Sequence, residues 1–152
     1  MKQNMNEALN ALNAGDILLI VENEEAKFRP YLVASSEFLT LNSLQLMLSY
    51  SSGVLYLVLD EAHFDKLGIE SSFFAARDER ELSQTVSVDI RQNPYSSFTP
   101  LGKLQTIKEI LNSRLTINKL ITPGNVLLKR INSKGVLLNK GVFESALDIS
   151  KM

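Results

Sequence analysis

The 152-residue sequence contains no cysteine and only one histidine, His63. The lack of cysteine excludes a disulfide framework, a thiolate zinc site, an iron–sulfur cluster and a cysteine nucleophile. A single histidine also excludes a metal site built from several histidines. No run of about 18 apolar residues occurs, so no membrane span is expected. Residues 1–16 lack the apolar stretch of a secretory signal, which favours a cytoplasmic protein.

The remaining composition is that of one folded domain covering residues 1–152. The hydrophobic content of 45% is sufficient for a core, and the charged content of 22% is ordinary. These values exclude a disordered chain. The formal net charge of -1 argues against a general nucleic-acid binder, and we expect neither a nucleic-acid nor a membrane partner.

The small net charge conceals an uneven distribution along the chain. Residues 1–102 carry 7 basic and 14 acidic side chains, whereas residues 103–152 carry 9 basic and 3 acidic ones. Two interpretations remain open. Either the two parts pack together and their surfaces attract, or the second part presents a basic face to an anion or an acidic partner.

The order of the predicted elements indicates an α/β (α+β) fold, with one mixed β-sheet flanked by helices. The apolar run 16–21 is predicted to be a central strand with both faces buried, and 22–30 a polar loop. Apolar periodicity predicts a clear helix over 101–111, and period-two alternation gives strand 85–90 one wet face. The other predicted helices are 4–14, 40–48, 60–67 and 143–149, the other strands are 31–34, 54–59, 126–128 and 136–138, and 70–83 is irregular.

Several short motifs have both a chemical and a structural interpretation. Asp60-Glu61-Ala62-His63 matches a helicase box, but no phosphate-binding loop accompanies it, so the match is chance and His63 is a surface residue. Glu22, Glu24 and Glu25 could hold magnesium, although a solvated acidic loop is the simpler interpretation. The turn at Ser51-Ser52-Gly53 could offer amides to a phosphate or be a turn alone.

Two glycine turns stand beside short apolar strands near the end of the chain. The first is Thr122-Pro123-Gly124-Asn125, and the second is Lys140-Gly141-Val142-Phe143-Glu144. Residues 127–139, which separate them, are predicted to form a β-ribbon. Such a ribbon would bring both turns to one end of the sheet.

These turns, with the opening helix, Gly15 and the Thr85-Val86-Ser87-Val88 strand, resemble the 3,4-dihydroxy-2-butanone 4-phosphate synthase family over residues 6–149. That family makes a four-carbon riboflavin precursor from ribulose 5-phosphate, releases formate and uses magnesium. The resemblance implies the family's fold and a homodimer with sites at its interface. Family members also usually continue beyond the position of Met152, which would leave a sheet edge open here.

The family's chemical residues are mostly replaced. Its metal-binding glutamate corresponds to Lys27 and its metal-binding histidine to Val142, so we expect no metal or other cofactor. The family's Arg-Pro-Gly-His motif ends here in Asn125, and its Asp-Arg pair is Gly102-Lys103. Glu144 is the one candidate catalytic residue that the resemblance retains.

The sequence therefore favours a non-catalytic homologue of the synthase that binds a phosphorylated metabolite or a protein. Candidate phosphate-binding residues are Lys27, Arg29, Lys103 and Asn125. An alternative is a diverged sugar-phosphate lyase or isomerase, in which Glu144 is the general base and Lys27 stabilises an enolate. A third possibility is a likeness to the broad α/β architecture alone, from which no function transfers.

Overall fold

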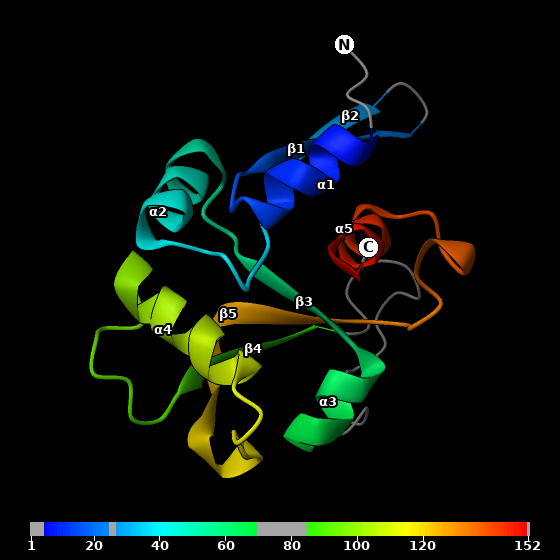
Figure 1. The fold of residues 1–152 in the computed structure, drawn as a ribbon. Coiled ribbons are helices and arrows are strands. Elements are labelled where there is room, and N and C mark those ends of the chain that lie inside the picture. The colour runs from blue at the N-terminus through cyan, green and yellow to red at the C-terminus, as the bar shows by residue number, and fades with distance from the viewer. Residues whose placement is uncertain (1–4, 25–26, 70–84, 152) are drawn as a thin grey trace.

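The computed structural model describes residues 5–24, 27–69 and 85–151, and the segment predicted to be irregular, 70–83, lies outside them. Helices and strands are interspersed along the whole chain, which confirms the predicted α/β class (Figure 1). Within these ranges, no helix combines the length and apolar content needed to cross a bilayer. The helices are α1 (Met5–Asn13), α2 (Leu41–Tyr50), α3 (Glu61–Leu67), α4 (Pro100–Leu111) and α5 (Val142–Lys151), and the strands are β1 (Leu18–Glu24), β2 (Lys27–Val33), β3 (Tyr56–Asp60), β4 (Thr85–Ile90) and β5 (Leu120–Ile131).

Strands β1 and β2 form an antiparallel hairpin that is separate from the other strands (Figure 1). The prediction of a buried central strand over 16–21 is wrong, because Leu19 is 63% exposed and Val21 is 48% exposed. The predicted loop over 22–30 is also wrong for most of its length. Its ends belong to the two strands, and Pro30 pairs with Val21. One mixed sheet was expected, but two sheets are described.

The second sheet has the strand order β3-β5-β4. Strand β5 runs parallel to β3 and antiparallel to β4, with a register shift between Val88 and Asp89. The expected turn at Pro123-Gly124 lies inside β5, where the Thr122–Pro123 peptide bond is cis. A Cβ at Gly124 would lie 1.9 Å from the Val88 carbonyl carbon, so only glycine allows the two strands to approach this closely.

The predicted β-ribbon over 127–139 is wrong. Strand β5 ends at Ile131, and a 3-10 turn over Gly135–Leu137 follows it. The φ angle of Gly135 is +52°, and the Val136 N–H donates a hydrogen bond to Asp148 Oδ2 at 2.9 Å. The Asp148 carboxylate of α5 thus holds this turn, and no strand is formed at 136–138.

Helix boundaries follow capping chemistry that is visible in the sequence. Thr40, Asp60 and Thr99 are the N-caps of α2, α3 and α4, and each side chain accepts a backbone N–H from three residues further on. Helix α3 ends at Gly68, whose φ of +69° is the left-handed conformation that glycine adopts without strain. The predictions for α3 and α4 are confirmed.

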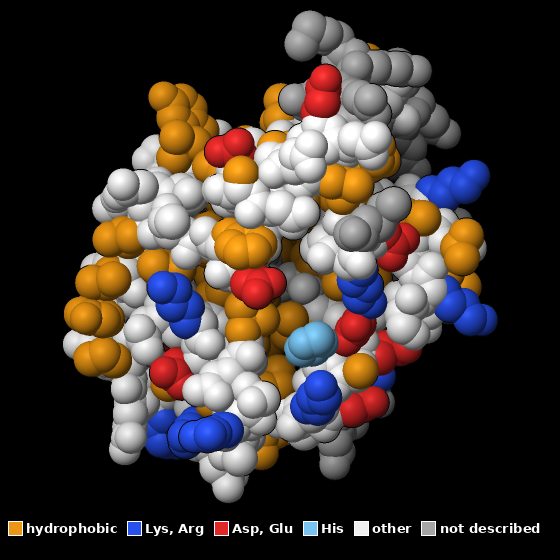
Figure 2. Space-filling view, viewed as in Figure 1, with side chains coloured by type: hydrophobic (Ala, Val, Ile, Leu, Met, Phe, Trp, Pro, Cys, Tyr) orange, Lys and Arg blue, Asp and Glu red, His pale blue; other side chains and the backbone are white. Residues whose placement is uncertain are grey.

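Charged side chains of the two parts of the chain meet in ion pairs. Arg130 Nη2 lies 3.9 Å from both Glu61 Oε1 and Asp65 Oδ1, and Lys151 Nζ lies 3.0 Å from Asp60 Oδ2. Figure 2 shows basic and acidic side chains interspersed on one face rather than segregated. The uneven charge along the sequence therefore contributes to the packing of its two parts.

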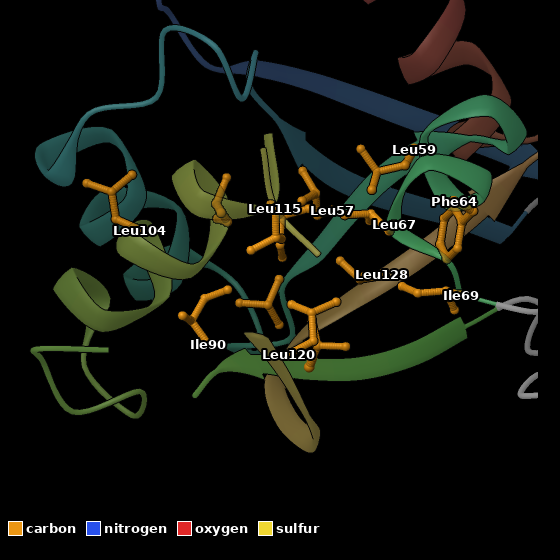
Figure 3. Packing of buried hydrophobic residues seen from close by; sticks show 14 of the residues in the cluster. Leu57, Leu59, Phe64, Leu67, Ile69, Ile90, Leu104, Leu115, Leu120 and Leu128 are labelled. Atoms are coloured by element: carbon orange, nitrogen blue, oxygen red, sulfur yellow. The ribbon is translucent and has the colours of Figure 1, made fainter. Parts of the chain in front are cut away.

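The hydrophobic core lies between one face of the three-stranded sheet and helices α2, α3 and α4 (Figure 3). Leu57 and Leu59 of β3 point into it, as do Val126 and Leu128 of β5. Helix α5 contacts β1, β3 and β5. Its Phe143 ring lies against Tyr56, which alternates with Leu57 along β3, so α5 covers the opposite face.

Candidate functional site

A cluster of polar side chains surrounds the bulge between β4 and β5. Asp89 is only 4% exposed, and its Oδ2 accepts hydrogen bonds from the Asn125 backbone N–H at 3.2 Å and from Asn125 Nδ2 at 2.9 Å. Asn125 Nδ2 also donates to Ser97 Oγ at 3.0 Å. Lys103 Nζ donates to the Asn125 carbonyl oxygen at 2.9 Å. The predicted residues Lys103 and Asn125 are therefore brought together.

Lys103 reaches this cluster from the first turn of α4. Partial burial lowers the pKa of its ammonium group, and the charge of Asp89 acts in the opposite direction. Asp89 Oδ1 has no hydrogen-bond partner among the residues that the structure describes. Because a buried carboxylate faces the lysine, the cluster already contains the anion that balances the charge of Lys103.

The loop before α4 packs tightly against the start of that helix. A Cβ at Gly102 would lie 2.0 Å from the Ser96 carbonyl oxygen, so this position has no room for a side chain. Asn93 Nδ2 donates to the Gly102 carbonyl oxygen at 2.9 Å and to Thr106 Oγ1 at 3.2 Å. The aspartate that the resemblance would place at 102 therefore does not fit this loop conformation.

Glu144 lies in the first turn of α5 and faces back toward the preceding loop. Its Oε1 accepts a hydrogen bond from Asn139 Nδ2 at 2.9 Å. A Cβ at Gly141 would meet Glu144 Oε2 at 2.4 Å, so the carboxylate lies directly over this glycine. Among the described contacts, no hydrogen bond or ion pair links Glu144 to Lys103 or Asn125. These contacts are those of a residue that stabilises the start of a helix.

Val142 lines the wall of a mainly apolar cavity of about 680 Å³. Its side chain is 7% exposed, and it starts α5 beside Phe143. An alkyl side chain cannot ligate a metal ion. Among the residues that the structure describes, no three His, Asp or Glu side chains are grouped so that they could hold a metal. The donors among the described residues therefore do not fit the magnesium site that the resemblance implies.

The two basic candidates of the hairpin are Lys27 and Arg29. Arg29 Nη1 lies 4.0 Å from Glu22 Oε2, its partner across the hairpin. Glu22 is thus part of a cross-strand ion pair. Glu25 and the side chain of Glu24 lie outside the described residues, so the magnesium interpretation of this acidic segment stays a prediction. The side chain of Lys27 lies outside the described part.

His63 and Asp60 form a second polar group at the start of α3. Asp60 Oδ1 accepts a hydrogen bond from the His63 backbone N–H at 3.1 Å and lies 2.7 Å from His63 Nδ1. Burial alone would raise the pKa of the Asp60 carboxyl, but hydrogen bonds from His63 and Lys151 outweigh it and hold that pKa well below its usual range. The His63 side chain is 50% exposed, as expected for a surface residue.

Sequence reasoning did not identify Asp89, Ser97 and Asn93 as members of the polar cluster. Alternation along 85–90 assigned Asp89 to a wet face, whereas the bulge after Val88 turns it inward beside Asn125. A usable signal was present, because Asp89 lies near the end of β4 and Lys103 lies in the first turn of the next helix. Only the pairing register of β4 with β5 shows that Asp89 and Lys103 lie close together.

Comparison with known proteins identifies similar chains. The family model of 3,4-dihydroxy-2-butanone 4-phosphate synthase matches residues 6–152. The chain is 24% identical over 149 residues to the synthase of Pseudomonas putida, covering 98% of this chain and 69% of that protein. It is 27% identical over 145 residues to the riboflavin biosynthesis protein RibBA of Rhodococcus erythropolis, covering 95% of this chain and 34% of that protein. The chain thus spans about a third of the Rhodococcus protein.

Solved structures show the same fold. A 3,4-dihydroxy-2-butanone 4-phosphate synthase in complex with two magnesium ions has a TM-score of 0.88 at 17% identity, covering 99% of this chain and 70% of that one. The Candida albicans synthase has a TM-score of 0.84 at 20% identity, covering 99% and 74%. The arrangement of helices and strands is therefore shared with these proteins.

Proposed function

Because the chain belongs to the 3,4-dihydroxy-2-butanone 4-phosphate synthase family, we propose that it is a non-catalytic member that keeps the fold and acts by binding another protein. The observation that carries this proposal is the burial of Val142 in the apolar wall of a cavity, at the position of the family's metal-binding histidine. Magnesium requires oxygen or nitrogen donors, which valine does not supply. A similar solved synthase was crystallised with two magnesium ions.

The geometry around Gly102 supports the same conclusion. The Ser96 carbonyl oxygen occupies the space of a side chain at this position, where the family has an aspartate. The difference from the family is therefore more than one replaced side chain, because the loop residue Ser96 lies where the aspartate side chain would begin. Restoring a carboxylate there would require the loop to move.

The charges of the polar cluster favour a protein partner over a phosphorylated metabolite. Lys103 faces Asp89, and Arg29 faces Glu22, so each described candidate for phosphate binding already has a carboxylate nearby. A dianionic phosphate would be repelled by the same carboxylates that partner these cations. We propose a homodimer as well, which the family resemblance implies and analytical ultracentrifugation would test.

The proposal is tested by incubating the full chain with ribulose 5-phosphate, with and without magnesium, and measuring formate. The Pseudomonas putida synthase, assayed in parallel, is the positive control. We expect no formate above background from this chain. We also expect no magnesium-dependent rise in melting temperature, whereas saturation at about 100 times Kd would add roughly 2.7 kcal/mol, or about 5 °C or more.

Formate release that disappears in Glu144→Gln, with the melting temperature unchanged, would overturn the proposal in favour of the diverged lyase. Glu7→Gln is the matched control, because Glu7 is an exposed glutamate in the first turn of another helix. If Glu144→Gln and Glu7→Gln behave alike and no product forms, the non-catalytic assignment stands.

A further inference from the structure

Two basic side chains lie at the end of the sheet where β4 stops and β5 starts. Ile90 of β4 and Leu120 of β5 pair with each other, and both belong to the hydrophobic core. The Arg91 N–H donates to the Lys119 carbonyl oxygen at 2.8 Å, which continues the antiparallel ladder by one residue pair. Since side chains alternate between the faces of a strand, Arg91 and Lys119 lie together on the face away from the core. Both residues are exposed.

The two cations are opposed without a carboxylate to balance them. Directly opposite residues of an antiparallel pair have Cβ atoms about 5 Å apart, and like charges at this spacing destabilise the pairing. Among the described residues, neither Arg91 nor Lys119 forms an ion pair, whereas Arg130 does. Asp89, two residues before Arg91, is buried in the polar cluster. The fold therefore keeps a positive charge excess here that does not stabilise its own described part.

Arg91 is held in a conformation that suits the recognition of carboxylates. Its Nε donates to the Asn118 carbonyl oxygen at 3.3 Å, which fixes the plane of the guanidinium group. The two Nη groups have no hydrogen-bond partner among the described residues. A guanidinium group binds a carboxylate through two parallel N–H donors, and a side chain that is already oriented loses less conformational entropy in doing so.

Apolar side chains border the two cations. Ile117 is 39% exposed and Ile121 is 36% exposed, and they lie on either side of Lys119 in the sequence. Figure 2 shows Lys and Arg side chains next to one another at the lower left of the molecule, over the start of β5. We call Arg91, Ile117, Lys119 and Ile121 the basic corner. Arginine beside exposed apolar side chains is typical of protein interfaces.

We propose that the basic corner docks an acidic segment of a partner protein. Carboxylates of that segment pair with Arg91 and Lys119, and its apolar side chains contact Ile117 and Ile121. This inference names the chemistry of the partner for the proposed binding role and rests on that role. The charge of the chain disfavours a nucleic acid, because residues 1–102 carry 14 acidic and 7 basic side chains and would repel a long polyanion. A short acidic segment covers the corner alone.

The test uses the full chain and a fluorescent twelve-residue peptide in which pairs of acidic residues alternate with leucines. We expect saturable binding by fluorescence anisotropy, weakened at least about fivefold when salt is raised from about 50 mM to about 300 mM. A peptide with glutamine and asparagine in place of the acidic residues should bind at least about tenfold more weakly. Equal binding of the two peptides would overturn the proposal, because it would indicate hydrophobic adsorption.

Variants of the protein test the location of the site. Lys119→Gln should weaken peptide binding at least about fivefold. Lys134→Gln is the matched control, because Lys134 is an exposed lysine beyond the other end of β5, and it should bind as the native chain does. Arg91→Lys keeps the charge but removes the paired guanidinium donors, and it should also weaken binding. Equal binding by Lys119→Gln and Lys134→Gln would overturn the proposal.

The melting temperature separates a docking role from a structural one. Because Lys119 opposes another cation, Lys119→Gln should leave the melting temperature unchanged or raise it. A clear fall would overturn the proposal, because it would show that the fold itself uses this charge. A dimer of the chain that the acidic peptide dissociates would assign the basic corner to a second copy and also overturn it.

A labelled thymidine oligonucleotide of the same charge as the peptide tests the other class of polyanion. It should bind at least about tenfold more weakly than the acidic peptide, and tighter binding that depends on Lys119 would overturn the assignment to a protein. Formate release from ribulose 5-phosphate reports on the proposed function alone. Formate release together with Lys119-dependent peptide binding would refute the non-catalytic role and leave the docking site in place. No formate together with salt-insensitive peptide binding would refute the docking site alone.

Discussion

Replacing Lys103 should destabilise the fold through the carboxylate it leaves behind. Lys103→Met removes the hydrogen bond to the Asn125 carbonyl oxygen and the cation that faces Asp89, which is 4% exposed. Breaking a buried charge pair from one side costs about 3–5 kcal/mol. Lys103 is only partly buried, so water replaces part of the interaction, and we expect a loss of about 2–3 kcal/mol.

Urea denaturation of a double-mutant cycle measures this effect. Asp89→Asn alone should cost about 1–2 kcal/mol, because the side-chain oxygen that accepts from Asn125 is retained. The double variant should be more stable than the sum predicts, by about 1–2 kcal/mol, since no uncompensated charge remains. Lys108→Met, on the exposed side of the same helix, should change stability by less than about 1 kcal/mol. Additive losses within about 0.5 kcal/mol would refute the pairing.

Three further predictions follow from packing and charge. Gly124→Ala should destabilise by more than about 4 kcal/mol in urea denaturation, because its Cβ would overlap the β4 backbone, and a smaller loss would contradict the close strand contact. Phe64→Ala removes a fully buried ring and should lower the free energy of unfolding by about 3–5 kcal/mol. Phe28→Ala removes a ring that is 69% exposed and should lower it by less than about 1 kcal/mol. Equal losses of stability in thermal unfolding would be inconsistent with the described core. Because the pKa of Asp60 is lowered in the folded protein, its contribution is present above about pH 4 and is lost as the pH falls through the folded value. Melting temperatures measured from pH 7 to pH 2 should therefore fall more steeply for the native chain than for Asp60→Asn, and parallel curves would refute this.

The sequence predicted those elements whose signals are local. The helix that became α4 has apolar residues at helical spacing, and Gly68 and Thr40 mark ends that depend only on capping chemistry. The burial of the apolar run 16–21 could not be predicted from its own residues, because it depends on what packs on each face of the strand. Its residues suit a strand buried on both faces, but Leu18 of β1 is buried and Leu19 is exposed, so only one face of this strand is covered.

The candidate site was predictable only in part, for a related reason. Lys103 and Asn125 could be named from motif positions, and they do meet. Asp89 could not be named, because the bulge that turns it inward depends on the pairing of β4 with β5. The length of β5 was hidden by Pro123, because proline usually interrupts a strand, whereas here it lies inside one.

The strand order of the larger sheet has a consequence for synthesis on the ribosome. Strands β3 and β4 do not pair with each other, because β5 lies between them. Both must wait until residues 120–131 have been translated, although β3 is complete at residue 60. A nascent chain that ends before β5 therefore presents two strands without their partner and a core that lacks Leu120, Val126 and Leu128. Chaperone contact and aggregation should concentrate in that interval, and burial of Val126 and Leu128 should end it.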